Sequence, residues 1–241
     1  MTNIEKILLA TNHRSFDYPK ERWAFYQEWN RALFLHWKVP VEILRELVPE
    51  KLHIDTYEGS AYVSLVAFTM EKIRPRFLPA VSFISDFHEI NLRTYVDNDN
   101  KKGVYFINIE AQKILSVLLT KYLSGLPYEK AKIRRGRNVY KSENSVKGFR
   151  LDAAFEPKEI ITKKTELQAW LTERYCLYMD KGDSLFCYDI HHKEWALKKV
   201  ELSKLDLAYE TGKLKLTNTP DLMQYSEGVG VVAWQRTKIT P

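Results

Sequence analysis

Short segments in which apolar residues alternate with polar ones, or form runs of strand length, recur along the chain and predict β-strands. The segments 91–96 and 103–110 flank DNDNKKG, a sequence rich in the Asp, Asn and Gly that favour turns. A second pair flanks KGD in the same way, so both pairs predict hairpins. Further alternation runs through 130–156. The predicted strands are residues 33–39, 61–70, 91–96, 103–110, 175–179, 185–191 and 230–234.

Helical spacing of apolar residues is confined to a few segments. The longest is 111–124, which ends at the stop signals Gly125 and Pro127. Its apolar face consists of Ile114, Val117, Leu118 and Leu119. Two short helices are predicted, one from Pro40 to Pro49 and one over 166–171. Within residues 1–32, a further helix is predicted from the spacing of Trp23, Phe25, Tyr26 and Trp29.

Strand segments outnumber helices, and most neighbouring strands are separated by short turns. No repeat and no Ser/Gly-rich linker divides the 241 residues. We therefore expect a single α+β domain over residues 1–241, with a largely antiparallel sheet.

Charge raises the question of polyanion binding, because 37 Lys and Arg face 31 Asp and Glu, a net charge of +6. The densest basic stretch is KAKIRRGRNVYK, from Lys130 to Lys141. Its basic residues alternate with apolar ones, and a half-buried strand presents such charges to water whether or not a ligand exists. No zinc-finger, recognition-helix or RNA-binding motif accompanies it. Nucleic acid is therefore an unlikely partner.

The sequence predicts a cytoplasmic protein. The N-terminus has only a four-residue apolar core after Glu5 and Lys6, unlike a signal peptide, and no apolar run approaches the ~20 residues that span a bilayer. Cys176 and Cys187 flank a turn and could face each other across a hairpin, but two buried thiols are the expectation in this compartment. No Cys/His cluster has metal-ligand spacing, so no metal site is predicted.

Seven ordered segments, taken together, resemble one family. They are FLHWKVPVEILRELVPEKLHIDTYEGSAYVSLVAF (34–68), FHEINLRTYV (87–96), GVYFINIEA (103–111), GLPYEKAKI (125–133), LTERYCLY (171–178), HHKEW (191–195) and QYSEGVGVVAW (224–234). In this order they resemble the YqjF-like family of bacterial proteins, for which no activity is established. The resemblance covers residues 20–236, nearly the whole chain.

This family is similar in architecture to acetoacetate decarboxylase, whose β-rich α+β fold encloses a small apolar cavity. The resemblance implies a barrel-like antiparallel core with a few flanking helices and an internal site for a small oxo acid or related carboxylate. By analogy it also implies a homo-oligomer. It implies no cofactor.

The resemblance also directs attention to Lys121. Acetoacetate decarboxylase uses an adjacent Lys-Lys pair shortly before a Gly-Tyr-Pro stretch, and the comparable sequence in this chain is KYLSGLPYEK. Tyr122 follows Lys121, so the lysine pair is missing. A Schiff-base lysine must be neutral, so its pKa must fall from about 10.4. Only burial or Arg93 could lower it, and an exposed lysine at a helix end is the simpler interpretation.

The segment HEINLRTYV places Glu89, Asn91, Arg93 and Tyr95 at alternate positions, on one face of a strand. This set suits a carboxylate site. Arg93 can clamp a carboxylate in bidentate fashion, and Glu89 or Tyr95 can transfer protons. Asn91 is a candidate ligand-binding residue beside them. The alternative is an ordinary solvent-exposed face.

The segment LTERYCLY offers weaker candidates. Glu173 and Tyr175 share one strand face and could bind a ligand, with Arg174 on the opposite face. A buried pair between Arg174 and a carboxylate, holding the sheet together, is the stronger interpretation.

Three histidines are also considered as ligand-binding residues. His191 and His192 point to opposite faces of a strand, so at most one of them can face a cavity. His36 lies in an apolar strand, where a histidine is more often a hydrogen-bonded core residue than a base.

Three functions follow as alternatives. The first is lyase-type chemistry on a small oxo acid, with the carboxylate on Arg93, protons handled by Glu89 or Tyr95, and an imine on Lys121 if that residue is buried. The second is a non-catalytic ligand-binding or regulatory protein that has kept the fold without the lysine pair. The third is a polyanion binder that uses Lys130–Lys141.

Overall fold

The computed structural model describes residues 1–112 and 128–239. Its helices are α1 (Asn3–Leu8), α2 (Val41–Arg45), α3 (Ser82–Ser85) and α5 (Glu166–Thr172). Its strands up to the middle of the chain are β1 (Phe25–Val39), β2 (His53–Ile54), β3 (Ala61–Pro75), β4 (Phe87–Asn98), β5 (Lys101–Ala111), β6 (Tyr128–Lys130), β7 (Lys132–Arg135) and β8 (Val139–Asn144). The remaining strands are β9 (Phe149–Ile160), β10 (Cys176–Lys181), β11 (Ser184–His192), β12 (Lys198–Thr211), β13 (Leu214–Leu216), β14 (Leu222–Ala233) and β15 (Thr237–Ile239).

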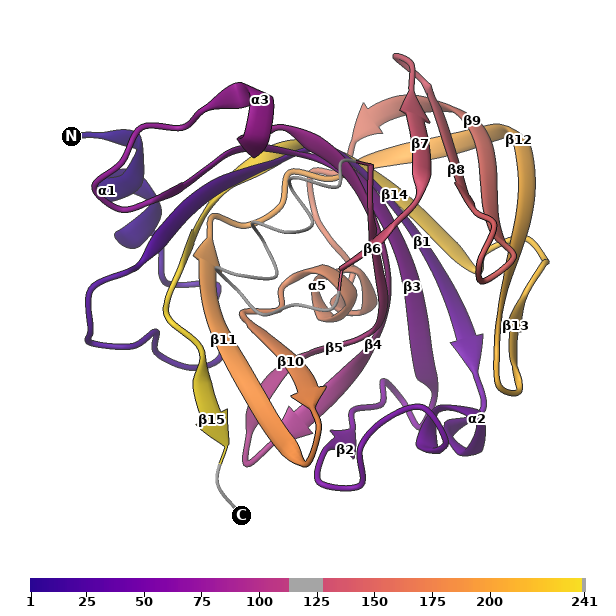
Figure 1. The fold of residues 1–241 in the computed structure, drawn as a ribbon, viewed down its shortest axis with the longest axis horizontal. Coiled ribbons are helices and arrows are strands. Elements are labelled where there is room, and N and C mark those ends of the chain that lie inside the picture. Colours follow the sequence, from indigo (N-terminus) through magenta and orange to yellow (C-terminus); the bar gives the residue numbers. More distant parts are fainter. Residues whose placement is uncertain (113–127, 240–241) are drawn as a thin grey trace.

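Within the described residues, seven strands close into a barrel in the order β1, β3, β4, β5, β10, β11 and β14. Figure 1 looks into this barrel. Its neighbouring strands are antiparallel except at the junction of β5 with β10, where Leu177 pairs with Val104 and Tyr178 with Tyr105 in parallel. The bonds between β11 and β14 complete the ring. The expected α+β fold with a largely antiparallel, barrel-like sheet is thus confirmed.

A second group of strands, β12, β9, β8 and β7, continues from β14 as an outer sheet. Two hydrophobic cores result from this arrangement. One packs the outer face of the barrel, including Leu65 and Leu92, against the outer sheet, including Leu151 and Tyr209. The other lies inside the barrel and contains side chains from all seven of its strands. Strand β4 is therefore covered on both faces.

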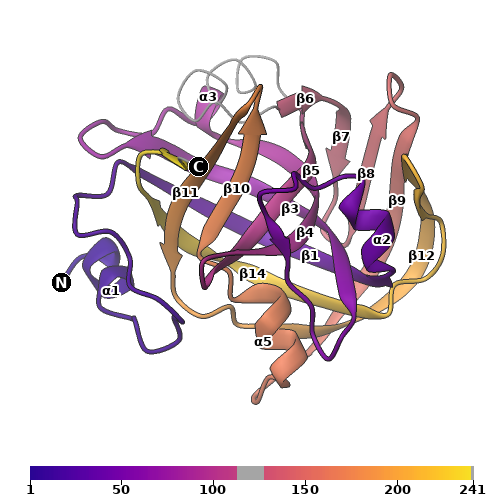
Figure 2. The ribbon, with the colours of Figure 1, turned by 90° about the horizontal axis from the view of Figure 1, so that it is seen from below.

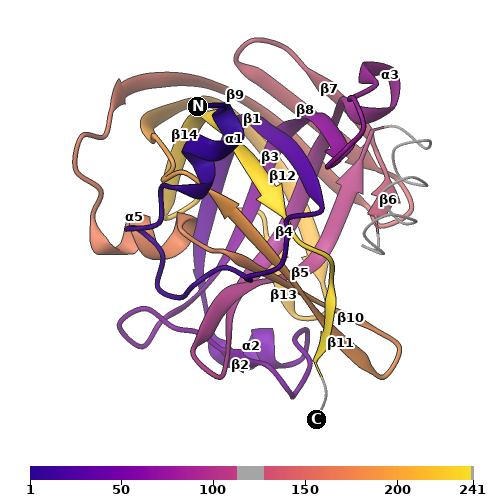
Figure 3. The ribbon, with the colours of Figure 1, turned by 90° about the vertical axis from the view of Figure 1, so that its left-hand side faces the viewer.

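Helix α5 closes one end of the barrel. The Trp170 ring lies 4.6 Å from the Tyr95 ring and 5.7 Å from the Tyr62 ring, between centroids. Tyr95 also donates a hydrogen bond to the Leu171 carbonyl at 3.0 Å. Figures 2 and 3 show α5 at one end of the molecule and α3 with β6 at the other.

The structure confirms the predicted strands, though most are longer than the sequence patterns indicate. It also confirms both hairpins and the two short helices, which are α2 and α5. The strand expected at 230–234 is part of β14, and β15 follows it. The alternating residues 198–211 form β12, a strand that the sequence reasoning missed. The helix expected over 111–124 lies almost entirely outside the described residues.

The helix predicted from the aromatic residues near the N-terminus is wrong. Only α1 is helical in that region, and Phe25, Tyr26 and Trp29 lie on β1. In a strand, residues 25, 27 and 29 share a face, so one face of β1 can point two rings into the barrel. Burial of these rings inside the barrel, and of Tyr26 against α1, outweighs the helical spacing.

Two further expectations concern cysteines and membranes. Cys176 and Cys187 lie on the two strands of the β10–β11 hairpin, two positions apart in register, and they are joined as a disulfide, so the expectation of two thiols is wrong. Among the helices of the described residues, none has the length and apolar character needed to cross a bilayer.

Candidate functional site

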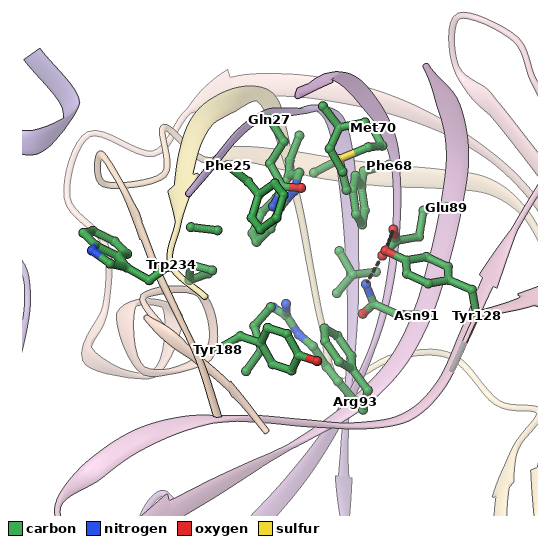
Figure 4. A pocket seen from close by; sticks show the side chains of 18 of the residues that line it. Phe25, Gln27, Phe68, Met70, Glu89, Asn91, Arg93, Tyr128, Tyr188 and Trp234 are labelled. Carbon is green, nitrogen blue, oxygen red and sulfur yellow. Dashed lines mark hydrogen bonds between the residues drawn. The ribbon is translucent and has the colours of Figure 1, made fainter. Parts of the chain in front are cut away.

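A cavity lies inside the barrel and extends toward the end opposite α5. Strand β1 contributes Phe25, Gln27 and Trp29, and β3 contributes Met70 and Ile73. The exposed residues Gln235 and Arg236, just after β14, form its rim. Figure 4 shows Glu89, Asn91 and Tyr128 together on one wall, with Phe25 across the space from Arg93. The space between the atoms here amounts to about 960 Å³ only when the open solvent at its mouth is included.

Register places the polar groups at successive depths along β4. Glu89 pairs with Phe68 of β3, Asn91 with Val66, and Arg93 with Ser64. Tyr95 follows next to α5 and forms part of the floor. The guanidinium of Arg93 is therefore the deepest charged group of the described lining, and Glu89 lies two levels closer to the mouth.

Glu89 is held by three side chains and is almost completely buried. Tyr128 donates a hydrogen bond to its Oε2 at 2.7 Å, and Asn91 donates to its Oε1 at 3.1 Å. Tyr140 donates to its backbone carbonyl at 2.7 Å. Burial raises the pKa of Glu89 from 4.5 to about 7, although these side-chain hydrogen bonds and the charge of Arg93 oppose the rise. Glu89 can therefore hold a proton near neutral pH and release it.

Arg93 is also buried, with 8% of its surface exposed, and it lines the same cavity. No Asp or Glu of the described residues lies within 4 Å of its guanidinium, and residues 113–127 contain neither type. Its Nε has no hydrogen-bond partner in the described part of the chain. The carbon centre of the guanidinium lies 6.0 Å from the Phe34 ring centroid, and burial lowers the pKa of Arg93. This cation therefore has no salt-bridge partner among the described residues, and the charge of Glu89 acts on it only from a greater distance.

Below Arg93, a chain of hydrogen bonds forms the floor. Tyr95 interacts electrostatically with Arg93, and its hydroxyl lies 2.5 Å from Ser64 Oγ. Ser64 Oγ lies 2.6 Å from His36 Nδ1, and His36 Nε2 lies 3.2 Å from Gln224 Oε1. Burial lowers the pKa of His36 to about 3, so the ring is neutral. Tyr95 and His36 are packed beneath the cavity rather than along its walls.

Glu173, Tyr175 and Arg174 lie outside the cavity, on the connection between α5 and β10 rather than on a strand. Glu173 accepts hydrogen bonds from Tyr175, from Lys164 at 2.6 Å and from the Trp195 amide. Arg174 donates to Asp55 at 2.7 Å, and both side chains are buried. The predicted buried pair of Arg174 with a carboxylate is confirmed. The prediction that Glu173 and Tyr175 share a strand face is wrong.

His191 and His192 do not line the cavity. His191 Nε2 lies 2.8 Å from the Ile7 carbonyl, and its Nδ1 lies 3.1 Å from Arg14, so the ring anchors the N-terminal segment. Burial lowers the pKa of His191 to about 4 and that of His192 to about 3. The His192 ring instead packs against Tyr175 and against the cavity-lining rings of Trp29 and Trp195.

Lys121 lies outside the described residues, so its position is not part of the site geometry. The described residues on either side of that segment are close to Glu89. Ala111 pairs with Glu89 across β4 and β5, and Tyr128 donates to its carboxyl group. Within residues 1–112 and 128–239, no group of three His, Cys, Asp or Glu side chains could hold a metal ion.

The basic stretch Lys130–Lys141 lies mainly on β7 and β8, at the edge of the outer sheet. Lys132 and Arg134 are exposed and Ile133 is buried, as the alternation predicts. Arg135 departs from this pattern, because its side chain is partly buried and donates to the Arg31 carbonyl.

Sequence reasoning missed most of the cavity wall. Tyr128 lies within the segment GLPYEK, Trp195 within HHKEW and Trp234 within GVGVVAW, so all three belong to segments that carry the family resemblance. Phe25 and Trp29 could have been found from alternation, since they stand four residues apart with Gln27 between them. The signal was present, but the helix interpretation of residues 1–32 hid it.

A family described as "Uncharacterized conserved protein" matches residues 26–230. The uncharacterized protein YqjF of Bacillus subtilis is 35% identical over 234 residues, which cover 93% of this chain and 96% of YqjF.

Solved structures give the fold. Acetoacetate decarboxylase from Legionella pneumophila matches with a TM-score of 0.60 and 10% identity, over 95% of this chain and 94% of that one. The enduracididine biosynthesis enzyme MppR complexed with pyruvate matches with a TM-score of 0.59 and 9% identity, over 94% and 93%. An acetoacetate decarboxylase-like enzyme from Sphingomonas wittichii gives 0.57 and 13%, over 93% and 97%. The chain thus has an acetoacetate decarboxylase-like fold, and it belongs to the same uncharacterized conserved family as YqjF.

Proposed function

We propose that this chain binds a small carboxylic acid inside the barrel, an oxo acid in the first instance, with the carboxylate on Arg93. One observation carries the proposal: a buried guanidinium lines the cavity without a carboxylate partner among the described residues. A buried charge is costly unless it is paired, and a planar guanidinium matches a carboxylate through two parallel hydrogen bonds. The ligand's carboxylate supplies the missing counter-ion.

The similarity to MppR and to acetoacetate decarboxylases supports small-molecule binding or lyase-type chemistry in a fold of this kind. MppR is described as complexed with pyruvate, which is a small oxo acid. In this chain the corresponding proposal rests on Arg93 and the cavity, because sequence identities of 9–14% carry the fold alone.

Glu89 is the proposed proton-transfer group. Its pKa of about 7 suits both donation and acceptance of a proton near neutral pH. A carboxylate clamped by Arg93 is stabilised more before the reaction than in a transition state that expels it as CO₂. We therefore favour chemistry that keeps this carboxylate, namely removal of a proton from the carbon beside the oxo group and its return. If Lys121 forms an imine with the oxo group, it would acidify that carbon further.

Binding is tested by calorimetry with pyruvate and acetoacetate. We expect binding to the wild type, loss of at least tenfold in affinity for Arg93→Met, and nearly unchanged affinity for Arg236→Met. Arg236 is the matched control, because it is the arginine at the exposed rim of the same cavity. Binding that depends on Arg236 and not on Arg93 would contradict the proposed clamp.

Catalysis is tested by incubating the protein with pyruvate in D₂O and following the methyl protons by NMR. We expect exchange that is lost in Glu89→Gln while binding is retained. Borohydride with intact-mass analysis tests the imine, and an adduct that survives Lys121→Ala refutes that role. Binding without exchange or adduct favours the non-catalytic alternative, which the missing lysine pair also suggests.

A further inference from the structure

The wall above Arg93 is built mainly from aromatic rings. Six of them are Phe25, Trp29, Phe34, Phe68, Phe106 and Trp195. Among the described lining residues, the charged groups are Glu89, Arg93 and, at the rim, Arg236. A ligand anchored on Arg93 therefore meets aromatic and aliphatic side chains over much of the rest of its surface, with Gln27, Asn91 and Tyr128 as polar exceptions.

Four of these rings contact one another and form a continuous surface: Trp29, Phe34, Phe68 and Trp195. The Trp29 and Phe68 centroids are 5.8 Å apart, those of Trp29 and Trp195 are 6.3 Å apart, and Phe34 meets Trp195 edge to face at 5.1 Å. An aromatic ring of a ligand can pack favourably against protein rings in these same offset and edge-to-face arrangements. Phe34 also lies beside the Arg93 guanidinium, so the surface starts at the anchoring group.

Pyruvate is too small to use this surface. Its methyl group would reach only the side chains nearest Arg93, and the rings farther along the wall would have no ligand contact. Each additional methylene that is buried strengthens binding about fourfold. A phenyl group attached one carbon from the oxo group would extend along the β3–β4 wall, from Arg93 toward Phe68.

We infer that the acid held by Arg93 carries an aromatic substituent, and that the rings of β1 and β3 select it over pyruvate and acetoacetate. This inference rests on the proposed function. The substrate class is therefore aryl-substituted carboxylic acids, with aryl-substituted 2-oxo acids as the first members. Phe68 is the proposed specificity-determining residue, because its ring lies on the wall between the level of Asn91 and the mouth.

Calorimetry with pyruvate, 4-methyl-2-oxopentanoate and phenylpyruvate tests the inference. We expect phenylpyruvate to bind 10- to 150-fold more tightly than pyruvate, since that range corresponds to full burial of one large apolar side chain. Packing of the phenyl ring against the wall should make the affinity for phenylpyruvate two- to tenfold higher than the affinity for 4-methyl-2-oxopentanoate, the branched alkyl acid. Equal or tighter binding of the branched acid overturns the aromatic class.

A matched pair of variants separates the wall from general stability. Phe68→Leu should lower the affinity for phenylpyruvate at least fivefold and leave that for pyruvate nearly unchanged. Phe155→Leu should change neither affinity, because Phe155 is buried in the other core, against the outer sheet. Circular dichroism checks that both variants fold. If Phe68→Leu does not fold, Phe68→Met is used in its place.

Different results would contradict the carboxylate site and the aromatic substrate class. If pyruvate and phenylpyruvate bind with similar affinity and both depend on Arg93, the aromatic class is wrong and the carboxylate site stands. If no acid of the series binds, or binding is independent of Arg93, the proposed function fails and the inference fails with it.

Discussion

Replacement of Glu89 by glutamine should make the protein more stable at high pH. Glu89 is 3% exposed, and burial raises the pKa of its carboxyl group from 4.5 to about 7. The folded chain therefore binds this proton more tightly than the unfolded chain does. Stability from this group is fully present below pH 4.5 and is lost as the pH rises through about 7. A pKa difference of about 2.5, at about 1.4 kcal/mol per unit, corresponds to about 3.5 kcal/mol.

The assay is urea unfolding at intervals between pH 5 and pH 8, followed by far-ultraviolet circular dichroism. Wild type should lose stability across this range, mostly between pH 5 and pH 7. Glu89→Gln should lack that part of the slope, because the amide stays neutral, and should exceed wild type by 1–3 kcal/mol at pH 8. Glu201→Gln is the control, since Glu201 is largely exposed.

Parallel pH profiles for wild type and Glu89→Gln would show that Glu89 is ionised throughout, and the proposed proton-transfer role would then lose its physical basis. A profile that changes equally in Glu201→Gln would point to a general effect of net charge. Only a slope specific to Glu89 supports the assignment.

Two further changes test how the barrel is held together. Arg174→Ala should destabilise the protein by 3–5 kcal/mol in urea unfolding, because it leaves Asp55 buried without its partner, and an Arg174→Met/Asp55→Leu double variant should recover much of this loss. Gly103→Ala should cost at least 1–3 kcal/mol, since a Cβ at that position overlaps the Cys176 carbonyl at the β5–β10 junction, whereas Gly136→Ala should be tolerated. A Gly103→Ala variant as stable as Gly136→Ala would contradict the described junction.

The sequence predicted strand β4 and its two faces because alternation is a local property. Glu89, Asn91 and Arg93 share a face whether that face meets water or a cavity, and the sequence left these alternatives open. Whether this face meets water or a cavity is decided by closure of the barrel. Closure depends on contacts between β5 and β10 and between β11 and β14. These contacts join segments far apart in the chain and leave no period in the sequence.

The N-terminal error has the same origin. Aromatic residues satisfied a helical spacing, and nothing local showed that Phe25 and Trp29 would meet rings from distant strands inside the barrel. The pair between Arg174 and Asp55 was predictable as a type, because a buried arginine needs an anion, but its partner 119 positions away was not.

By the same principle, the buried charge of Arg93 should lower the stability of the unliganded protein. Arg174 has Asp55 as its anion, whereas Arg93 has no carboxylate partner in the described residues. Arg93→Met keeps most of the side-chain volume and removes the charge, so the unliganded variant should be about 1–4 kcal/mol more stable than wild type. Thermal unfolding checks this, together with the shift produced by saturating oxo acid. We expect a higher Tm for the unliganded variant and no shift on adding the acid. If instead the variant is less stable than wild type without ligand, Arg93 already has an anion within the folded chain, and the cavity needs no carboxylate from outside.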